Sequence, residues 1–116
     1  DLTPGDPIEL DPISNVLNEQ DLAPTEFKLF QNFPNPFNPS TTIKYNLPGE
    51  MQIELSVYNL LGQKVRTLIS DHRPAGYHSV VWDGKNDRGV TVSTGIYIYQ
   101  LKTDKQTLVR KMILMK

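Results

Sequence analysis

From residue 27 to the end of the chain, apolar and polar residues alternate in short runs. Such alternation is typical of β-strands that turn one face to a core and the other to water. The runs end at residues that favour turns, such as Pro48-Gly49 and Pro74-Ala75-Gly76. No segment after residue 27 repeats its apolar residues at the helical period of about 3.6. The runs predict strands at residues 41–47, 52–57, 64–70, 77–82, 95–103 and 107–116, with a seventh short strand near 27–30 or 90–92.

The run from residue 64 to 70 breaks the strict alternation at Val65, Leu68 and Ile69. Either a β-bulge, which is one extra residue in the strand, or a twisted edge would explain such an irregularity. Short strands at a spacing of about ten residues, with turns between them, predict an all-β fold, either a sandwich or a barrel. The core is expected from the inward positions Ile43, Tyr45, Leu47, Ile53, Leu55, Val57, Val80, Trp82, Tyr97, Tyr99 and Leu101.

The first 26 residues have a different character, rich in proline, aspartate, asparagine and glutamate and free of aromatic residues. Residues 1–27 carry seven acidic residues and no Lys or Arg, whereas residues 28–116 carry six acidic and twelve basic residues. We interpret residues 1–26 as a flexible acidic linker or the tail of a preceding domain, and residues 27–116 as the folded domain. A single helical turn near Ser14–Glu19 is expected at most, because isolated helices of this length are marginal in water.

Composition excludes several classes of protein. The chain has 116 residues and no cysteine, so disulfides, thiolate catalysis and cysteine-based zinc sites are excluded. No run of about 18 apolar residues is present that could span a membrane as a helix. The chain begins without a methionine, a basic region or an apolar region, and therefore not with a signal peptide. We expect a piece of a longer protein or a processed form.

Catalytic constellations are missing from the sequence. His72 and His78 are the only histidines, and neither accompanies a recognisable nucleophile motif. His78 falls on an expected strand and His72 in a turn-like stretch, so both are interpreted as structural or surface residues. We therefore expect neither an enzyme nor a cofactor.

The loop from residue 83 to 89 contains oxygen-bearing side chains between two glycines. Asp83, Asn86 and Asp87 offer oxygen ligands to calcium, although the spacing is not that of an EF-hand. The favoured interpretation is that these side chains cap their own backbone.

Four aromatic residues allow two interpretations. Tyr77, Trp82, Tyr97 and Tyr99 would suit a platform on which sugar rings stack. Three of them, however, share strand faces with aliphatic residues, which favours a place in the core.

Basic residues accompany the hydrophobic last strand, as Arg110, Lys111 and Lys116. Such residues discourage aggregation at a sheet edge, or they serve recognition of this strand by another protein. A flat edge strand also allows edge-paired dimers. Nucleic acid is not expected as a partner, because the basic residues are dispersed and lack interleaved aromatic residues.

Five blocks follow one another along the chain, namely Asn32-Phe-Pro-Asn-Pro-Phe-Asn-Pro-Ser-Thr-Thr-Ile-Lys-Tyr45, Val57-Tyr-Asn-Leu-Leu-Gly-Gln-Lys-Val65, Pro74-Ala-Gly-Tyr-His-Ser-Val-Val-Trp-Asp-Gly84, Gly95-Ile-Tyr-Ile-Tyr99 and Arg110-Lys-Met-Ile-Leu-Met-Lys116. In this order they resemble the type A C-terminal sorting domains of the type IX secretion system. The related immunoglobulin-like domain of the flagellar hook-capping protein shares the Trp-Asp-Gly and Gly-Ile-Tyr blocks.

The resemblance implies an Ig-like antiparallel β-sandwich of about seven strands that directs an N-terminally fused cargo across the outer membrane. The cargo would pass through the periplasm to the cell surface. There a peptidase would cleave the chain within residues 1–26 and so remove the domain from the cargo. The resemblance implies that the type IX translocon recognises the last strand. If this strand lies at a sheet edge, its free backbone groups would pair with a strand of the translocon, and Arg110, Lys111 and Lys116 would add charge complementarity. Fold-maintaining roles are implied for the motif residues Pro34, Asn35, Pro36, Trp82, Gly95 and Tyr97.

Two other functions stay open from the sequence alone. A carbohydrate-binding module of a secreted hydrolase requires exposed aromatic residues on one face. A scaffold module for flagellar or surface structures requires only the β-sandwich.

Overall fold

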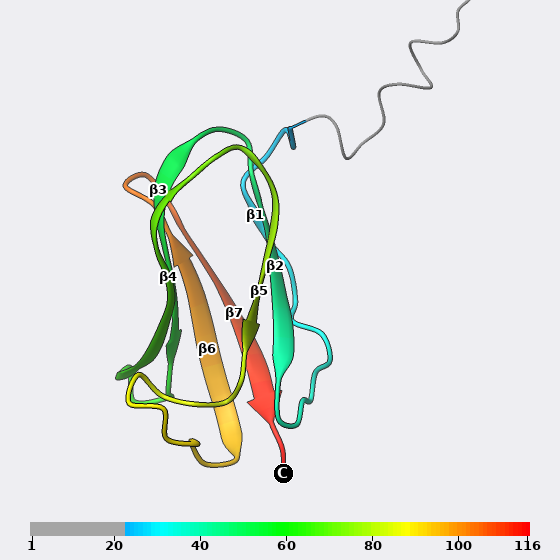
Figure 1. Cartoon of the computed structure of the whole chain (residues 1–116), viewed down its shortest axis with the longest axis vertical. Helices are drawn as coiled ribbons and strands as arrows, with labels where there is room; N and C mark the ends of the chain where they lie inside the picture. Colours follow the sequence, from blue (N-terminus) through cyan, green and yellow to red (C-terminus); the bar gives the residue numbers. More distant parts are fainter. Residues whose placement is uncertain (1–22) are drawn as a thin grey trace, which may run out of the picture.

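The computed structural model describes residues 23–116, which form two antiparallel β-sheets packed face to face (Figure 1). The helical turn expected near Ser14–Glu19 and nearly all of the expected linker lie outside the described residues. Within residues 23–116, no helix is long and apolar enough to cross a membrane. The expected all-β sandwich of seven strands is confirmed.

The smaller sheet has three strands in the order β1-β2-β5. Strand β1 (Lys28–Leu29) pairs with β2 (Thr41–Leu47), which pairs along its whole length with β5 (Gly76–Trp82). The short strand expected near residues 27–30 is therefore β1. In the alternative region, Thr91 forms only an isolated bridge with Lys85.

The larger sheet has four strands in the order β4-β3-β6-β7. Its strands are β3 (Met51–Tyr58), β4 (Lys64–Arg73), β6 (Gly95–Lys102) and β7 (Thr107–Leu114). The β3–β4 register shifts between Leu55 and Ser56 and again between Val57 and Tyr58, which confirms the predicted bulge. Strand β4 continues past the predicted end to Arg73, so His72 lies in a strand and not in a turn-like stretch.

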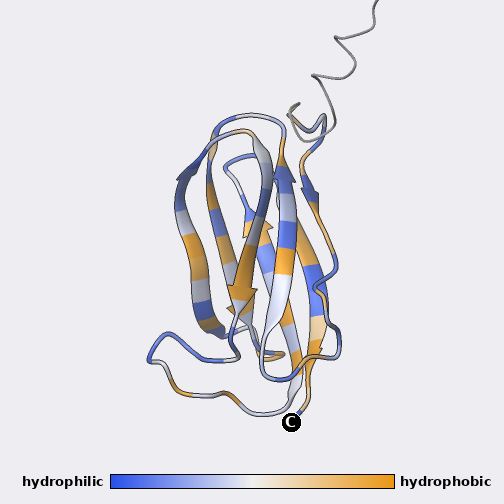
Figure 2. Ribbon diagram, turned by 45° about the vertical axis from the view of Figure 1, so that its right-hand side comes forward, coloured by the Kyte–Doolittle hydropathy of each residue, from blue (hydrophilic) through white to orange (hydrophobic). Residues whose placement is uncertain are grey.

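The core lies between the sheets, and apolar residues alternate with polar ones along most strands (Figure 2). Of the predicted core residues, Val80 is only partly buried, because β5 is an edge strand of the smaller sheet. All the others are buried. Four hydrophobic core residues were not predicted, namely Leu29, Phe37, Met112 and Leu114.

The segment between β1 and β2 crosses from one sheet to the other. Phe33 forms an antiparallel bridge with Thr42 of β2, and Phe37 forms a parallel bridge with Leu114 of β7. Phe37 is buried against Trp82, with ring centroids 5.6 Å apart. The proline-rich stretch is therefore part of the sandwich, and residues 31–37 are called the strap below.

A buried tyrosine hydroxyl holds the strap. Tyr99 of β6 is fully buried; its hydroxyl accepts a hydrogen bond from the Asn32 amide at 2.8 Å and donates one to the Phe30 carbonyl at 2.7 Å. The Asn32 side chain, also buried, donates to Thr41 Oγ1 and to the Pro34 carbonyl. These groups satisfy one another in a place that water does not reach, as buried polar groups must.

Replacing Tyr99 by Phe should lower the free energy of unfolding by about 2 kcal/mol, because the Asn32 amide would be left buried without a partner. Urea unfolding measures the loss. Tyr58→Phe is the control, because the Tyr58 hydroxyl makes no hydrogen bond within residues 23–116. Equal stability of the two variants would contradict the role assigned to Tyr99.

Stability should also fall above about pH 10, the ordinary pKa of tyrosine. Burial raises the pKa of both Tyr99 and Tyr45, so the folded chain resists an ionisation that the unfolded chain undergoes. The stabilising contribution is complete below pH 10 and is lost as the pH rises through the raised folded values. Urea midpoints between pH 9 and pH 11 should fall less steeply in Tyr99→Phe than in the wild type.

Candidate recognition site at the C-terminal strand

The three predicted recognition residues lie along and just beyond β7, an edge strand of the larger sheet. Arg110 reaches across to the smaller sheet and donates from Nε to the Leu29 carbonyl at 2.8 Å. Lys111 and Lys116 are exposed. Arg110 and Lys111 are neighbours on β7, while Lys116 follows the end of the strand, so the structure gathers the three residues along one edge of the sandwich.

The outer edge of β7 is closed by the strap. Ile113 donates its amide to Asn35 Oδ1 and accepts a hydrogen bond from the Phe37 amide, each at 3.0 Å. The Met115 amide donates to the Phe37 carbonyl at 3.0 Å, and Gln31 Nε2 donates to the Lys111 carbonyl at 2.7 Å. A strand from another protein cannot pair with β7 between Lys111 and Met115 while the strap is in place.

The proline motif and the C-terminal strand are therefore in direct contact. The Pro34 carbonyl accepts hydrogen bonds from Asn32 and Thr41, and Asn35 binds the backbone of β7. Pro36 links Asn35 to the buried Phe37. These contacts are those expected of residues that maintain the fold. Sequence reasoning missed Gln31 and Phe37, whose partners lie some 80 residues away.

Two of the remaining motif residues, Trp82 and Tyr97, belong to the core. Trp82 is fully buried; its ring packs on Tyr97 with centroids 5.4 Å apart, and its Nε1 donates to the Lys85 carbonyl. Gly95 is the first residue of β6, two positions before Tyr97, and is partly buried. With Trp82, Tyr97 and Tyr99 buried, only Tyr77 of the four candidate platform aromatics is exposed.

The ion pairs within residues 23–116 are concentrated on β4. Lys64, Arg66, His72 and Arg73 supply the basic partner of every one of them. The hydrogen bond from Lys64, and to a smaller extent the one from Ser56, lowers the pKa of Glu54 below its ordinary value. Arg110, Lys111 and Lys116 form no ion pair with an acidic residue of this described part of the chain, and the same holds for Arg88 and for its other lysines except Lys64.

The candidate calcium loop is held by its own polar side chains. Asp83 Oδ1 accepts the Lys85 amide, and Asn86 Oδ1 accepts the amides of Arg88 and Val90. Asp87 Oδ1 accepts the Thr67 amide of β4 at 3.0 Å. No group of three or more acidic or histidine side chains suited to a metal ion occurs within residues 23–116. The hydrogen bonds agree with the capping interpretation, and calcium binding stays a minor hypothesis.

The two histidines make structural contacts. His72 lies 3.0 Å from a Glu50 carboxylate oxygen, with both side chains exposed. His78 stacks on Tyr45 and its Nε2 lies 2.9 Å from the Pro74 carbonyl. Within residues 23–116, neither ring forms a hydrogen bond with a serine or threonine hydroxyl, as the activation of such a nucleophile requires.

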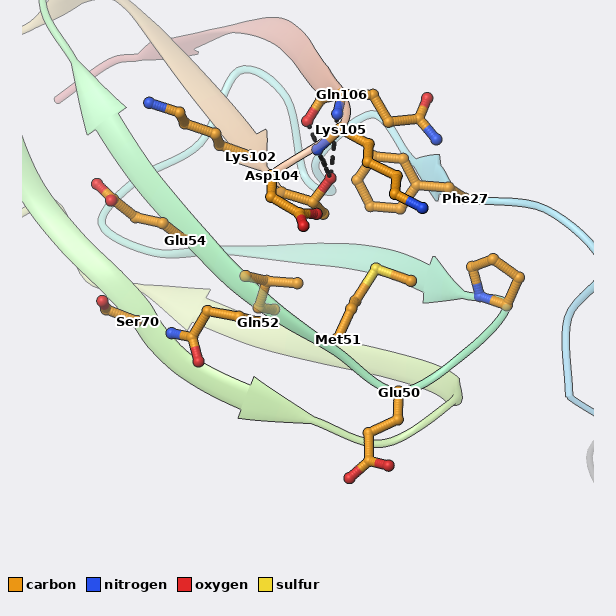
Figure 3. A pocket seen from close by; sticks show the side chains of 13 residues that line it. Phe27, Glu50, Met51, Gln52, Glu54, Ser70, Lys102, Asp104, Lys105 and Gln106 are labelled. Carbon is orange, nitrogen blue, oxygen red and sulfur yellow. Dashed lines mark hydrogen bonds between the residues drawn. The ribbon is translucent and has the colours of Figure 1, made fainter.

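A hollow of about 600 Å³ lies at the opposite end of the sandwich from the C-terminus (Figure 3). Phe27 and Met51 give it an apolar lining, and Lys105 also lines it. Thr103 Oγ1 accepts the amides of Lys105 and Gln106, so its oxygen is used within the turn. The hollow has no converging polar groups of the kind that fix a small ligand.

Replacing Asn35 by Ala should release the edge of β7. The variant loses the hydrogen bond to the Ile113 amide, and its free energy of unfolding should fall by about 1 kcal/mol. Hydrogen exchange at the Ile113 amide should accelerate more than exchange elsewhere in β7. Asn38→Ala is the matched control, because Asn38 is exposed and its side chain makes no hydrogen bond within residues 23–116. Unchanged exchange at Ile113 would contradict the role of Asn35.

Comparison with known proteins places the fold. The family model described as the FlgD Ig-like domain matches residues 38–107, more than half of the chain. FlgD from P. aeruginosa matches with a TM-score of 0.52 and 26% identity, over 64% of this chain and 60% of that chain. A search of curated protein sequences found no significant match.

Two solved structures from Porphyromonas gingivalis also match. Dimeric latent PorU matches with a TM-score of 0.59 and 20% identity, over 72% of this chain and 9% of that chain. PorZ, described as an essential surface component of the type IX secretion system, matches with a TM-score of 0.49 and 16% identity, over 78% and 11%. At such identities the match to PorU shows the shared fold alone. The aligned part is less than two thirds of each of the three solved chains.

Proposed function

The chain belongs to the FlgD Ig-like domain family, and from this premise we propose that it is a non-catalytic sorting domain for type IX secretion. In this proposal the domain directs an N-terminally fused cargo from the periplasm across the outer membrane. A surface peptidase then cleaves within residues 1–26 and releases the cargo to the cell surface or the medium. The type IX translocon is the proposed partner, and no cofactor takes part.

One observation supports the sorting domain over other members of the family. The match to the family model begins at residue 38 and ends at residue 107, so the whole Asn-Phe-Pro-Asn-Pro motif and all of β7 except its first residue lie outside it. These two segments carry the features that resemble sorting domains, and they bind each other through Asn35, Phe37 and Ile113. The two segments outside the matched range thus form one structural unit, in which the strap fixes β7.

The closed edge changes the expected mode of recognition. An incoming strand finds the β7 backbone already paired from Lys111 to Met115. We therefore assign recognition to the side chains of Arg110, Lys111 and Lys116, which a fixed strand holds at one edge. Side-chain charge gives specificity and speeds encounter with a complementary surface.

Export of a reporter tests the proposal. The double variant Lys111→Ala, Lys116→Ala, fused behind a reporter with a Sec signal in a bacterium that has the secretion system, should accumulate in the periplasm. Both side chains are exposed, so the melting temperature should stay within about 2 °C of the wild type. Deletion of residues 111–116 is a poorer test, because it also removes the buried Met112 and Leu114.

Lys102→Ala, Lys105→Ala is the matched control, since these lysines are exposed at the other end of the sandwich. It should be exported like the wild type. Normal export of the double variant, even after Arg110→Ala is added to it, would overturn the assignment of recognition to this edge. Periplasmic retention of the wild-type fusion would overturn the sorting function itself.

A scaffold module is the second candidate, supported by the match to FlgD from P. aeruginosa. The same reporter separates the two functions, because a scaffold module does not carry a fused protein across the outer membrane. The carbohydrate-binding alternative has less support, since Trp82, Tyr97 and Tyr99 are buried.

A further inference from the structure

Each sheet of the sandwich has two edges, and most of them are protected. Strand β7 is closed by the strap from Lys111 onward, and β1 is only two residues long. The first half of β4 is covered by Asp87, which binds the Val65 carbonyl and the Thr67 amide, and its second half carries the Asp71–Arg73 ion pair. Covering, shortening and charging edge strands are the usual means by which proteins prevent unwanted pairing.

Strand β5 has none of these protections. It pairs with β2 on one side, and within residues 23–116 no hydrogen bond engages the backbone on its other side. The strand is seven residues long and contains no Lys, Arg, Asp or Glu. An open edge of this length and composition is a template for a further strand.

The side chains on the outward face of β5 indicate which side chains an incoming strand should have. Tyr77 and Val81 are 51% and 59% exposed, and the small Ser79 lies between them. Lys44 is paired with Ser79 in the β2–β5 register and is exposed on the same face. None of the three strands of this sheet contains an acidic residue, so the charge of Lys44 is not balanced within the sheet.

We propose that β5 is a second interaction site, which accepts an extended segment of a partner protein with the pattern apolar–x–acidic–x–apolar. The incoming strand pairs with the β5 backbone, and its apolar side chains contact Tyr77 and Val81. Its acidic side chain lies opposite Ser79 and about 10 Å from the Lys44 strand position, within the joint reach of a lysine and a glutamate. The proposal is independent of the sorting function and of the Lys111–Lys116 edge.

A second copy of the chain fits this edge less well. Pairing β5 with β5 would form one continuous sheet in which Lys28 and Lys44 of both copies share a face without any acidic residue. Like charges on one sheet face oppose association, whereas an acidic partner compensates them.

Two capped peptides test the proposal against the full ¹⁵N-labelled chain: Thr-Val-Thr-Glu-Thr-Val-Thr and the same peptide with Lys at its centre. The glutamate peptide should shift the amide resonances of Gly76–Trp82 and bind about threefold more tightly than the lysine peptide. In Lys44→Glu the preference should invert. Lys102→Glu, on the other sheet, should keep the wild-type preference.

Several outcomes would overturn the proposal. These are no binding up to millimolar peptide, shifts centred on β4 or β7, or a preference that Lys44→Glu leaves unchanged. Concentration-dependent shifts of the β5 amides without peptide would instead assign the edge to a second copy of the chain. Export of the reporter fusion is a separate measurement, so failure here leaves the proposed function untouched.

Discussion

The Tyr99 hydroxyl is the point on which the arrangement of this domain depends. It lies in the core of the larger sheet, yet it binds the backbone at Phe30 and Asn32, the segment that joins the smaller sheet to the strap. Because this buried hydroxyl both donates and accepts a hydrogen bond, it fixes the orientation of the Phe30–Asn32 backbone as well as its distance from β6. From this anchor the strap runs on to place Phe37 against Trp82 and Asn35 against β7. Core, strap and terminal strand are thus tied together by a few polar contacts in an apolar surrounding.

Local patterning predicted the strands well, because alternation in β2, β3 and β6 is a direct consequence of one buried and one exposed face. The bulge in β4 was predictable for the same reason, since Leu68 and Ile69 cannot both point inward in a regular strand. The burial of Phe37 was not predictable, because a proline-rich stretch has no period from which to infer a face. The partial exposure of Val80 follows from the place of β5 at an edge, which alternation alone does not reveal.

The candidate site was predicted in composition but not in geometry. The sequence pointed to Arg110, Lys111 and Lys116 by their charge beside an apolar strand. It could not indicate that the edge of that strand is occupied, because the bonds from Gln31 and Asn35 join residues 80 and 78 positions apart. The open edge of β5 was not predictable for the same reason. Which strands lie at an edge, and which edges are covered, depends on contacts between residues far apart in the sequence.

The strap and β7 run parallel, and the described chain enters and leaves the sandwich at opposite ends (Figure 1). Tension between the two ends therefore pulls the strap and β7 past each other along their common axis. The hydrogen bonds from Gln31, Asn35 and Phe37 then share the load together instead of breaking in sequence, as they would if the strands were peeled apart. The proline motif and the terminal strand form a mechanical clamp, and a domain drawn by one end through a narrow passage would resist unfolding most strongly at this contact.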